Sequence, residues 1–490
     1  MEMIRKSVLV LFAFVLVVCA VYANAASENF KKGLQFYRAG DLDAAAASMQ
    51  SAIDEDPNDA YANSWLGFIR LKQNKPAEAV APLQKASELL PKDAEVWTNL
   101  GTALLLIGEN QKAADAYEQA LKLRPTSAEI IYNLASVELK LGHPDKAEKL
   151  LRDAAARKPN DANIQNNLGL ALQQQGKLDE ALTVFKKASS LDSNNPSILL
   201  NLGLAQKEKG DLAGAKQSLQ RAVAAGKDNY YAHLALGEIY AKENKVDEAI
   251  KEYAAAANLK PDQFTPNYNL GVLYARQNKH TLAIDAYSAA LKAKPTDLET
   301  MTGLGWSLFK AGKQQEAIKQ LKVVIDQDAS YVSAHRRLAA IYTAQKDAAA
   351  DADSRRSLRD LAIAEWQTVV KLDPKDVNAR INLGNLYLEA RDFDKAAAEY
   401  KAASNLDSKN PQAKLGLGLI LVEQEKFYDA ITLFRDLVKS NPNLAAAYNN
   451  LGVALEKVGR KDEARQQYQK ALKIDPNYSD AKYNLDRLGQ

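Results

Sequence analysis

The chain has 490 residues, of which 47% are hydrophobic and 26% charged, and its formal net charge is +3 at pH 7. Such a balance argues against nucleic acid as the main partner, because phosphate binding needs a concentrated basic surface. The single cysteine, Cys19, rules out a disulfide within the chain and a cysteine cluster for a metal.

The first 25 residues are predicted to be a secretory signal peptide. Arg5 and Lys6 form a basic start, residues 7–21 an apolar core, and residues 23–25 a small-residue cleavage site, Ala-Asn-Ala. The apolar stretch is short for a membrane span of about 20 residues. We therefore expect a periplasmic or secreted protein that begins at Ala26. The alternative is a membrane anchor formed by the uncleaved segment, the one case in which membrane contact is expected.

A 34-residue repeat fills the chain from residue 26 to residue 478. A period of this length predicts a stacked solenoid, in which each unit packs mainly against its neighbours. One such array can extend over a length that would otherwise form several globular domains. The thirteen copies start at Ala26, Ala60, Ala94, Ala128, Ala162, Pro196, Tyr230, Phe264, Leu298, Val332, Val377, Pro411 and Ala445.

Small residues at two places of the repeat predict a pair of closely crossing helices. The twentieth place is alanine in every copy, and the eighth is glycine in eleven copies, as at Gly101 and Gly271. Two helices can approach closely only where neither carries a bulky side chain. Large apolar residues such as Leu104 and Tyr117 surround these places at helical spacing. Each repeat is therefore expected to form two packed helices.

Turn and capping residues mark where these helices begin and end. Nine copies carry proline near their end, which stops the second helix because proline cannot donate a backbone hydrogen bond. Two residues after such a proline, Asp59, Asp93, Ser127, Asp161 and Asp297 are placed to cap the next helix. The glycines expected in the turn between the two helices of a repeat are Gly40, Gly108, Gly142, Gly176, Gly210 and Gly312.

This pattern resembles the tetratricopeptide repeat family. The third copy meets the family pattern position by position at Trp97, Leu100, Gly101, Leu104, Ala113, Tyr117, Ala120 and Pro125. The resemblance covers Ala26 to Tyr478. It implies an all-α, right-handed superhelical solenoid of thirteen helix pairs, whose first helices line a concave groove and hold partner proteins.

Two segments depart from the repeat. Residues 479–490 carry an apolar stripe with polar residues between, and are predicted to form a C-terminal capping helix. The tenth copy is 45 residues long because eleven extra residues lie near positions 346–356. Their alanine-rich, charged composition predicts lengthened helices or a mobile turn. Both a protrusion that contacts a partner and a tolerated insertion fit this composition.

Asparagine recurs at the sixth place of the repeat, in a part of the first helix that faces the groove in the resembled family. A carboxamide both donates and accepts hydrogen bonds, so a row of them suits a peptide backbone. The row resembles the asparagine ladder of O-linked N-acetylglucosamine transferases. The alternative is that asparagine is simply the common family residue before Leu-Gly. The candidates are Asn99, Asn133, Asn167, Asn201, Asn269, Asn382 and Asn450.

Charged and aromatic residues add a second candidate group. Arg336 and Arg337 could hold a carboxylate or a phosphate, or could be an ordinary salt-bridged pair. Trp306 and Phe309, at places comparable to Tyr268 in the neighbouring repeat, are candidate anchors for a partner side chain or members of the core.

Patterns for catalysis, metal or cofactor binding are absent from the sequence. The four histidines lie in separate repeats, and no glycine-rich phosphate loop is present. We therefore expect no enzyme and no cofactor. The first hypothesis is a non-enzymatic adaptor of the cell envelope that binds peptide segments of other proteins, and assists secretion or the assembly of envelope complexes. The alternatives are an exopolysaccharide-export component that binds glycan directly, and a recruiting subunit for a transferase.

Overall fold

The computed structural model describes residues 27–488, which form α-helices and no strand. They divide into two compact units, an amino-terminal unit that ends at Glu252 and a carboxy-terminal unit that begins at Tyr253. The predicted signal peptide, residues 1–25, lies outside the described residues. Within residues 27–488, no helix has both the length and the apolar character that a membrane span requires.

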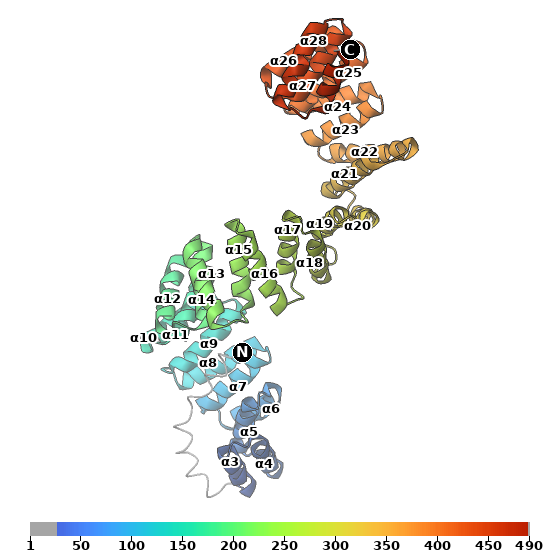
Figure 1. The fold of residues 1–490 in the computed structure, drawn as a ribbon. Coiled ribbons are helices and arrows are strands. Elements are labelled where there is room, and N and C mark those ends of the chain that lie inside the picture. The colour runs from blue at the N-terminus through green and yellow to red at the C-terminus, as the bar shows by residue number, and fades with distance from the viewer. Residues whose placement is uncertain (1–26, 489–490) are drawn as a thin grey trace. The chain divides into compact units, whose positions relative to one another are not determined.

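Helices of the amino-terminal unit follow one another in pairs joined by short turns (Figure 1). The unit contains α3 (Glu28–Arg38), α4 (Leu42–Glu55), α5 (Ala60–Lys72), α6 (Pro76–Leu89), α7 (Ala94–Leu106), α8 (Asn110–Leu123), α9 (Ala128–Leu141), α10 (Pro144–Arg157), α11 (Ala162–Gln174), α12 (Leu178–Leu191), α13 (Pro196–Lys209), α14 (Leu212–Ala225) and α15 (Tyr230–Lys242). The boundary between the units lies within α16 (Val246–Leu259).

The carboxy-terminal unit repeats the same arrangement. It contains α17 (Phe264–Arg276), α18 (His280–Ala293), α19 (Leu298–Lys310), α20 (Gln314–Gln327), α21 (Val332–Ala348), α22 (Ala352–Leu372), α23 (Val377–Glu389), α24 (Phe393–Leu406), α25 (Pro411–Glu423), α26 (Phe427–Ser440), α27 (Ala445–Lys457), α28 (Lys461–Ile474) and α29 (Ser479–Leu488). The predicted all-helical class and tandem helix pairs are confirmed, and α3 to α28 fit the expected thirteen pairs.

The small residues lie where the two helices of a repeat cross, as predicted. A side chain on Gly101 would come within 3.0 Å of the Tyr117 ring, and one on Gly169 within 2.5 Å of the Phe185 ring. The eighth place is therefore small because the large residue at the twenty-fourth place fills the space. The alanines of the twentieth place are all fully buried: Ala45, Ala79, Ala113, Ala147, Ala181, Ala215, Ala249, Ala283, Ala317, Ala362, Ala396, Ala430 and Ala464.

Both kinds of predicted helix boundary are confirmed. The side chain of each predicted capping residue accepts a hydrogen bond from a backbone N–H of the helix that follows; these residues are Asp59, Asp93, Ser127, Asp161 and Asp297. All six predicted turn glycines have positive φ. At the same place of other repeats Asn74, Asn244, Asn278, Arg391 and Glu425 adopt this left-handed conformation. Asparagine tolerates it better than most side chains, whereas arginine and glutamate do so at a cost.

A recurring hydrogen bond fastens each linker to the helix that follows it. In seven repeats the side chain at the fourth place of the first helix donates to the backbone carbonyl six residues earlier, over 3.0–3.3 Å. That carbonyl follows the end of a helix and has no helical partner. The donors differ in chemistry but share this place; they are Asn63, Trp97, Gln165, His233, Asn267, His335 and Arg380.

Two of these donors are histidines that also bind a glutamate of the second helix. His335 contacts Glu365 through Nδ1 at 2.6 Å and the Ala329 carbonyl through Nε2 at 3.1 Å. Arg380 makes the same two kinds of contact, to Glu399 at 2.8 Å and to the Pro374 carbonyl at 3.0 Å. These side chains therefore join a linker, a first helix and a second helix.

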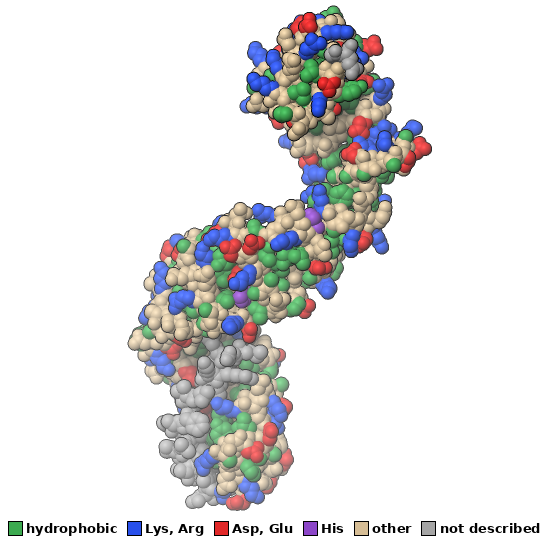
Figure 2. Space-filling view, viewed as in Figure 1, with side chains coloured by type: hydrophobic (Ala, Val, Ile, Leu, Met, Phe, Trp, Pro, Cys, Tyr) green, Lys and Arg blue, Asp and Glu red, His purple; other side chains and the backbone are tan. Residues whose placement is uncertain are grey.

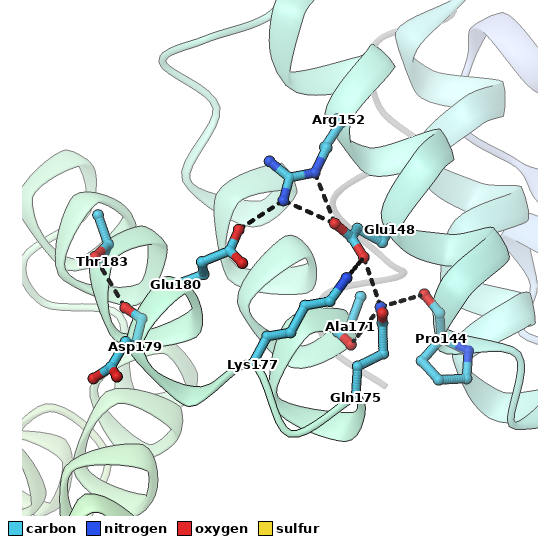
Figure 3. A network of polar contacts seen from close by, with 9 residues as sticks. All are labelled: Pro144, Glu148, Arg152, Ala171, Gln175, Lys177, Asp179, Glu180 and Thr183. Carbon is cyan, nitrogen blue, oxygen red and sulfur yellow. Dashed lines mark hydrogen bonds and ion pairs between the residues drawn. The ribbon is translucent and has the colours of Figure 1, made fainter.

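Charged side chains add a junction between the fourth and fifth repeats (Figure 3). Glu148 of α10 accepts from Lys177 at 2.7 Å, from Arg152 at 2.8 Å and from Gln175 at 2.8 Å. The hydrogen bond from Lys177 is the main reason that the pKa of Glu148 is lowered to about 2. Arg152 also reaches Glu180 of α12 at 2.8 Å. The network links one repeat to the next by charge-assisted hydrogen bonds.

The eleven-residue insertion is built as longer helices. Helices α21 and α22 have 17 and 21 residues, whereas α19 and α20 of the preceding repeat have 13 and 14. Lys346, which is 7% exposed, pairs with Glu389 of α23 at 2.5 Å and with Asp347 at 2.9 Å. Arg355 donates to two carbonyls of the turn. The base of the extension is thus tied to the next repeat.

The last helix, α29, packs on the end of the array. Ala481 is fully buried, and Leu485 and Leu488 contact the core of the final repeats. Its Arg487 pairs with Glu456 at 2.8 Å.

Candidate binding face on the first helices

The predicted binding residues all lie on first helices of repeats, from α7 to α27. We call the side chains at the fifth, sixth and ninth places of these helices the first-helix face. Figure 2 shows blue and red side chains interspersed over each unit on the visible side, in line with the nearly balanced charge of the sequence.

In the amino-terminal unit the predicted asparagines are in two different states. Asn99 and Asn133 are half-buried and make no side-chain hydrogen bond to any residue between 27 and 488. Asn167 donates to Ser136 of the preceding repeat at 3.0 Å, and Asn201 donates to Asn166 of the preceding repeat at 2.9 Å. The first pair has free hydrogen-bonding capacity, whereas the second pair already joins neighbouring repeats.

The carboxy-terminal unit shows the same contrast. Asn269 and Asn382 are half-buried and bond to no described side chain or backbone group through their carboxamides. Asn450 accepts from Asn449 at 3.2 Å, and Asn449 accepts from Asn484 of α29 at 3.0 Å. The ladder stays a prediction, and the structure identifies which of its members have capacity for a ligand.

Two glycines that interrupt the ladder have a packing explanation. A side chain on Gly303 would come within 2.9 Å of the Tyr287 ring, and one on Gly416 within 2.3 Å of the Tyr400 ring. Each tyrosine belongs to the second helix of the preceding repeat. The sixth place is therefore glycine in these two repeats, because a large ring occupies the space that an asparagine side chain would need.

Arg336 and Arg337 have different surroundings. Arg336 is held by Asp376 at 2.8 Å and lies 3.7 Å from Asp373, so its charge is compensated within the protein. Arg337 is exposed and lies over the Trp306 ring, with its guanidinium carbon 4.3 Å from the ring centroid. It forms no ion pair with any described residue. The two neighbouring arginines are thus not equivalent in what they can offer a ligand.

Trp306 and its neighbours form an aromatic cluster on α17 and α19. Trp306 is half-buried, with the Phe309 ring 5.3 Å away. Tyr268 stacks on Phe264 at 5.4 Å. The Tyr268 ring also lies 6.3 Å from that of Tyr287, whose pKa burial raises to about 12. These rings are partly buried, so they pack against the core and also contribute to the surface.

Sequence reasoning missed a hollow in the amino-terminal unit. It has a volume of about 500 Å³ between α6, α7 and α8, and its lining combines apolar side chains such as Trp97 and Leu104 with charged ones such as Glu109 and Lys112. Ile107, 40% exposed, completes it. Five other repeats carry glutamine where Ile107 stands, but Leu141 and Val458 are apolar at the same place, so this residue type by itself did not identify the hollow.

No group of three or more metal-ligating side chains is found among residues 27–488. His233 and His335 hold linkers, and His143 contacts Glu138 at 2.8 Å. The arrangement on the first helices can offer hydrogen bonds, aromatic contacts and positive charge.

Family models match most of the chain. Models described as tetratricopeptide repeat match residues 36–103, 255–297, 299–330, 348–411 and 415–479. A model described as the cilia and flagella-associated protein 70 C-terminal domain matches residues 82–267. The chain belongs to the tetratricopeptide repeat family, whose members are generally non-enzymatic scaffolds for protein interactions.

Several solved structures are similar to parts of the chain. The MamA protein is 30% identical over 34% of this chain and 90% of its own, with a TM-score of 0.33. YrrB, described as a tetratricopeptide repeat protein with an unusual peptide-binding site, is 26% identical over 38% of this chain and 96% of its own, with a TM-score of 0.33. PilF of Pseudomonas aeruginosa is 22% identical over 44% of this chain and 97% of its own, with a TM-score of 0.39. No curated protein matches the chain in sequence.

Proposed function

We propose that the protein is a scaffold of the cell envelope that binds extended segments of other proteins along the first-helix face of each unit. The observation that carries this proposal is the set of half-buried carboxamides without a partner, at Asn99, Asn133, Asn269 and Asn382. A carboxamide that is partly exposed and bonds to no described residue can both donate to and accept from a ligand in place of water. Spaced carboxamides can bond a peptide backbone independently of its side chains.

The exposed aromatic residues favour peptide over glycan as the ligand. A sugar polymer needs a continuous track of rings matched to its faces. Among the described residues, the most exposed aromatic side chains are Phe36, Tyr231, Tyr428 and Tyr483, in α3, α15, α26 and α29. The first three helices belong to repeats that are not consecutive, and α29 is the helix that follows the last repeat, so these residues do not provide such a track.

The binding test compares the two states of asparagine. The chain from Ala26 onward, which contains every described helix, is panned against a displayed library of random twelve-residue peptides. The selected peptides are then titrated against two double variants, one in each unit: Asn99→Ala with Asn133→Ala, and Asn269→Ala with Asn382→Ala. We expect each peptide to bind one of these variants roughly tenfold more weakly with unchanged thermal unfolding, because these side chains hold no other described residue.

A matched double variant is Asn167→Ala with Asn201→Ala, which removes the carboxamides that join repeats. We expect it to lower the unfolding temperature, because two hydrogen bonds between repeats are lost. Recovery of no peptide from the library, or peptides that bind the Asn99–Asn133 and the Asn269–Asn382 double variants as tightly as the parent, would rule out the proposed binding mode.

The location in the envelope rests on residues 1–25 and needs its own test. These residues are fused to alkaline phosphatase lacking its own signal, which is active only outside the bacterial cytoplasm. We expect active, soluble enzyme whose processed form begins after Ala25. Activity confined to the membrane fraction would instead indicate an uncleaved anchor, and an inactive fusion would exclude export.

A further inference from the structure

In the carboxy-terminal unit, three cationic side chains each lie over an aromatic ring of a first helix. The Arg337 guanidinium lies 4.3 Å from the centroid of Trp306, and the Lys310 ammonium lies 5.0 Å from the same centroid. The Lys294 ammonium lies 4.3 Å from the centroid of Phe264. None of the three forms an ion pair with a residue between 27 and 488. An aromatic face attracts a cation but leaves its charge uncompensated.

Acidic side chains around this cluster are already occupied. Asp376 accepts hydrogen bonds from Nη2 and Nε of Arg336, at 2.8 and 3.2 Å. Glu299 accepts from the Tyr268 hydroxyl at 2.7 Å, and Asp297 caps α19. The protein therefore neutralises Arg336 but leaves its neighbour Arg337 without a carboxylate.

The surroundings of Arg337 make an external anion favourable. Arg337 is exposed as a whole residue, but desolvation of its guanidinium and the charge of Arg336 lower its pKa, so a nearby anion would offset a charge that the described residues leave without an ion pair. Contact with the Trp306 ring restricts the motion of the guanidinium, so less orientational freedom is lost when two parallel hydrogen bonds form to a carboxylate. The Trp306 ring is only half-buried, which leaves part of it for an apolar neighbour of that carboxylate.

The ladder also changes character at this point. Gly303 and Arg337 replace asparagine at the sixth place of the ninth and tenth repeats. A segment that lies along the face would meet carboxamides at Asn269 and Asn382, and a guanidinium between them. The ligand at this place should carry a single negative charge and not many. Glu299 lies on the same helix as Trp306, and its own negative charge would repel a polyanion.

We propose that Arg337 and Trp306, with Lys310 beside them, bind an acidic side chain of the partner segment together with an apolar residue next to it. This inference rests on the proposed function and adds the chemistry of the partner. In this proposal Arg337 binds the carboxylate and Trp306 contacts the apolar neighbour. Lys310 adds to the local positive charge.

The test uses the peptides selected on the chain from Ala26 onward. We expect selected sequences to be enriched in Asp or Glu next to an apolar residue, relative to the input library. Among the peptides that bind Asn269→Ala with Asn382→Ala more weakly than the parent, the best one and its analogue with Gln for Glu are titrated against the parent and Arg337→Gln. The variant should bind the acidic peptide roughly tenfold more weakly, about 1.4 kcal/mol, and should bind the Gln analogue as the parent does.

The neighbouring arginine supplies the matched control. Arg336→Gln removes the same charge one residue away, but from a side chain that Asp376 already neutralises, so the preference for the acidic peptide should persist. Arg337→Lys, which keeps the charge and loses the planar fork, should retain part of the preference.

Selected peptides without acidic enrichment, or an equal loss in Arg336→Gln and Arg337→Gln, would overturn the assignment to Arg337 while the scaffold function stands. A library that yields no binding peptide would overturn the scaffold function and this inference with it.

Discussion

At the scale of single residues, the repeat is governed by the space and the backbone conformation that each place allows. The twentieth place must be alanine-sized because it is fully buried at a helix crossing, as at Ala396. The fifteenth place must adopt positive φ because it turns the chain from the first helix to the second, as at Gly108. These two demands explain why the pattern is legible in the sequence.

The fifteenth place of the repeat, in the turn, supports two predictions: one substitution there should destabilise the protein and another should stabilise it. Gly108→Ala should destabilise the protein by about 1 kcal/mol, because alanine is strained at φ +86° although no atom lies within 4 Å of the added methyl group. Glu425→Gly should stabilise it by about as much, because this glutamate adopts φ +60°. Urea unfolding followed by circular dichroism measures both changes. Equal midpoints for parent and Gly108→Ala would show that the turn is not strained by a side chain.

At the scale of helices and linkers, polar side chains decide how one repeat is joined to the next. The donor at the fourth place binds the linker carbonyl in seven repeats, whether it is asparagine, glutamine, tryptophan, histidine or arginine. Sequence alone did not predict this bond, because donors of such different shape show no common residue type. Only the geometry of the linker brings them to one acceptor.

His335 tests this joint. His335→Phe should destabilise the tenth repeat by about 2 kcal/mol, because a linker carbonyl and Glu365 both lose a partner at a buried place. His335→Gln, which places at this site the donor that Gln165 provides in another repeat, should recover part of the loss. Thermal unfolding of the three proteins measures the effect, and a glutamine variant as unstable as the phenylalanine variant would argue against the linker bond.

Glu148 supports a prediction on pH dependence at the same scale. Its pKa is lowered from 4.5 to about 2, chiefly by Lys177, so its bonds stabilise the folded state above about pH 4.5. That contribution is lost as pH falls from 4.5 toward 2, because the carboxylate is protonated. Its size should be about 1 kcal/mol, since Lys177 and Arg152 are partly exposed.

The measurement compares urea midpoints at pH 6 and pH 3. Glu148→Gln should lose less stability than the parent between these values, because it carries no titrating carboxylate. Asp145→Asn, which changes an exposed carboxylate of the same helix that bonds to no described residue, should behave as the parent does. A parent and a Glu148→Gln variant with the same pH dependence would contradict the role of this network.

At the scale of the whole molecule, each unit is a series of local contacts. The extensive contacts join helices that are one or two steps apart in the chain. Stability in such an array is approximately a sum of repeat and neighbour terms, so damage to one repeat should remain local.

Ala396→Leu tests this locality. The added side chain should overpack the crossing of α23 and α24 and cost about 1–3 kcal/mol. Hydrogen exchange should rise in α21 to α26 and stay unchanged in α5 to α8. Ala398→Leu, at an exposed place of α24, should leave exchange unchanged everywhere. Faster exchange of α5 to α8 in Ala396→Leu would show that the array unfolds as one cooperative body.

The sequence by itself determined the repeat, the all-helical fold, the helix boundaries and the crossing residues, because these depend on contacts within one period. It also located the candidate binding residues, since their places in the repeat specify a helix face. Only the tertiary structure decided which of them have capacity for a ligand. Asn99 is unbonded while Asn167 is not, and Arg337 lacks the carboxylate that Arg336 has. These differences arise from residues about one repeat away, whose side chains meet only after the helices have packed.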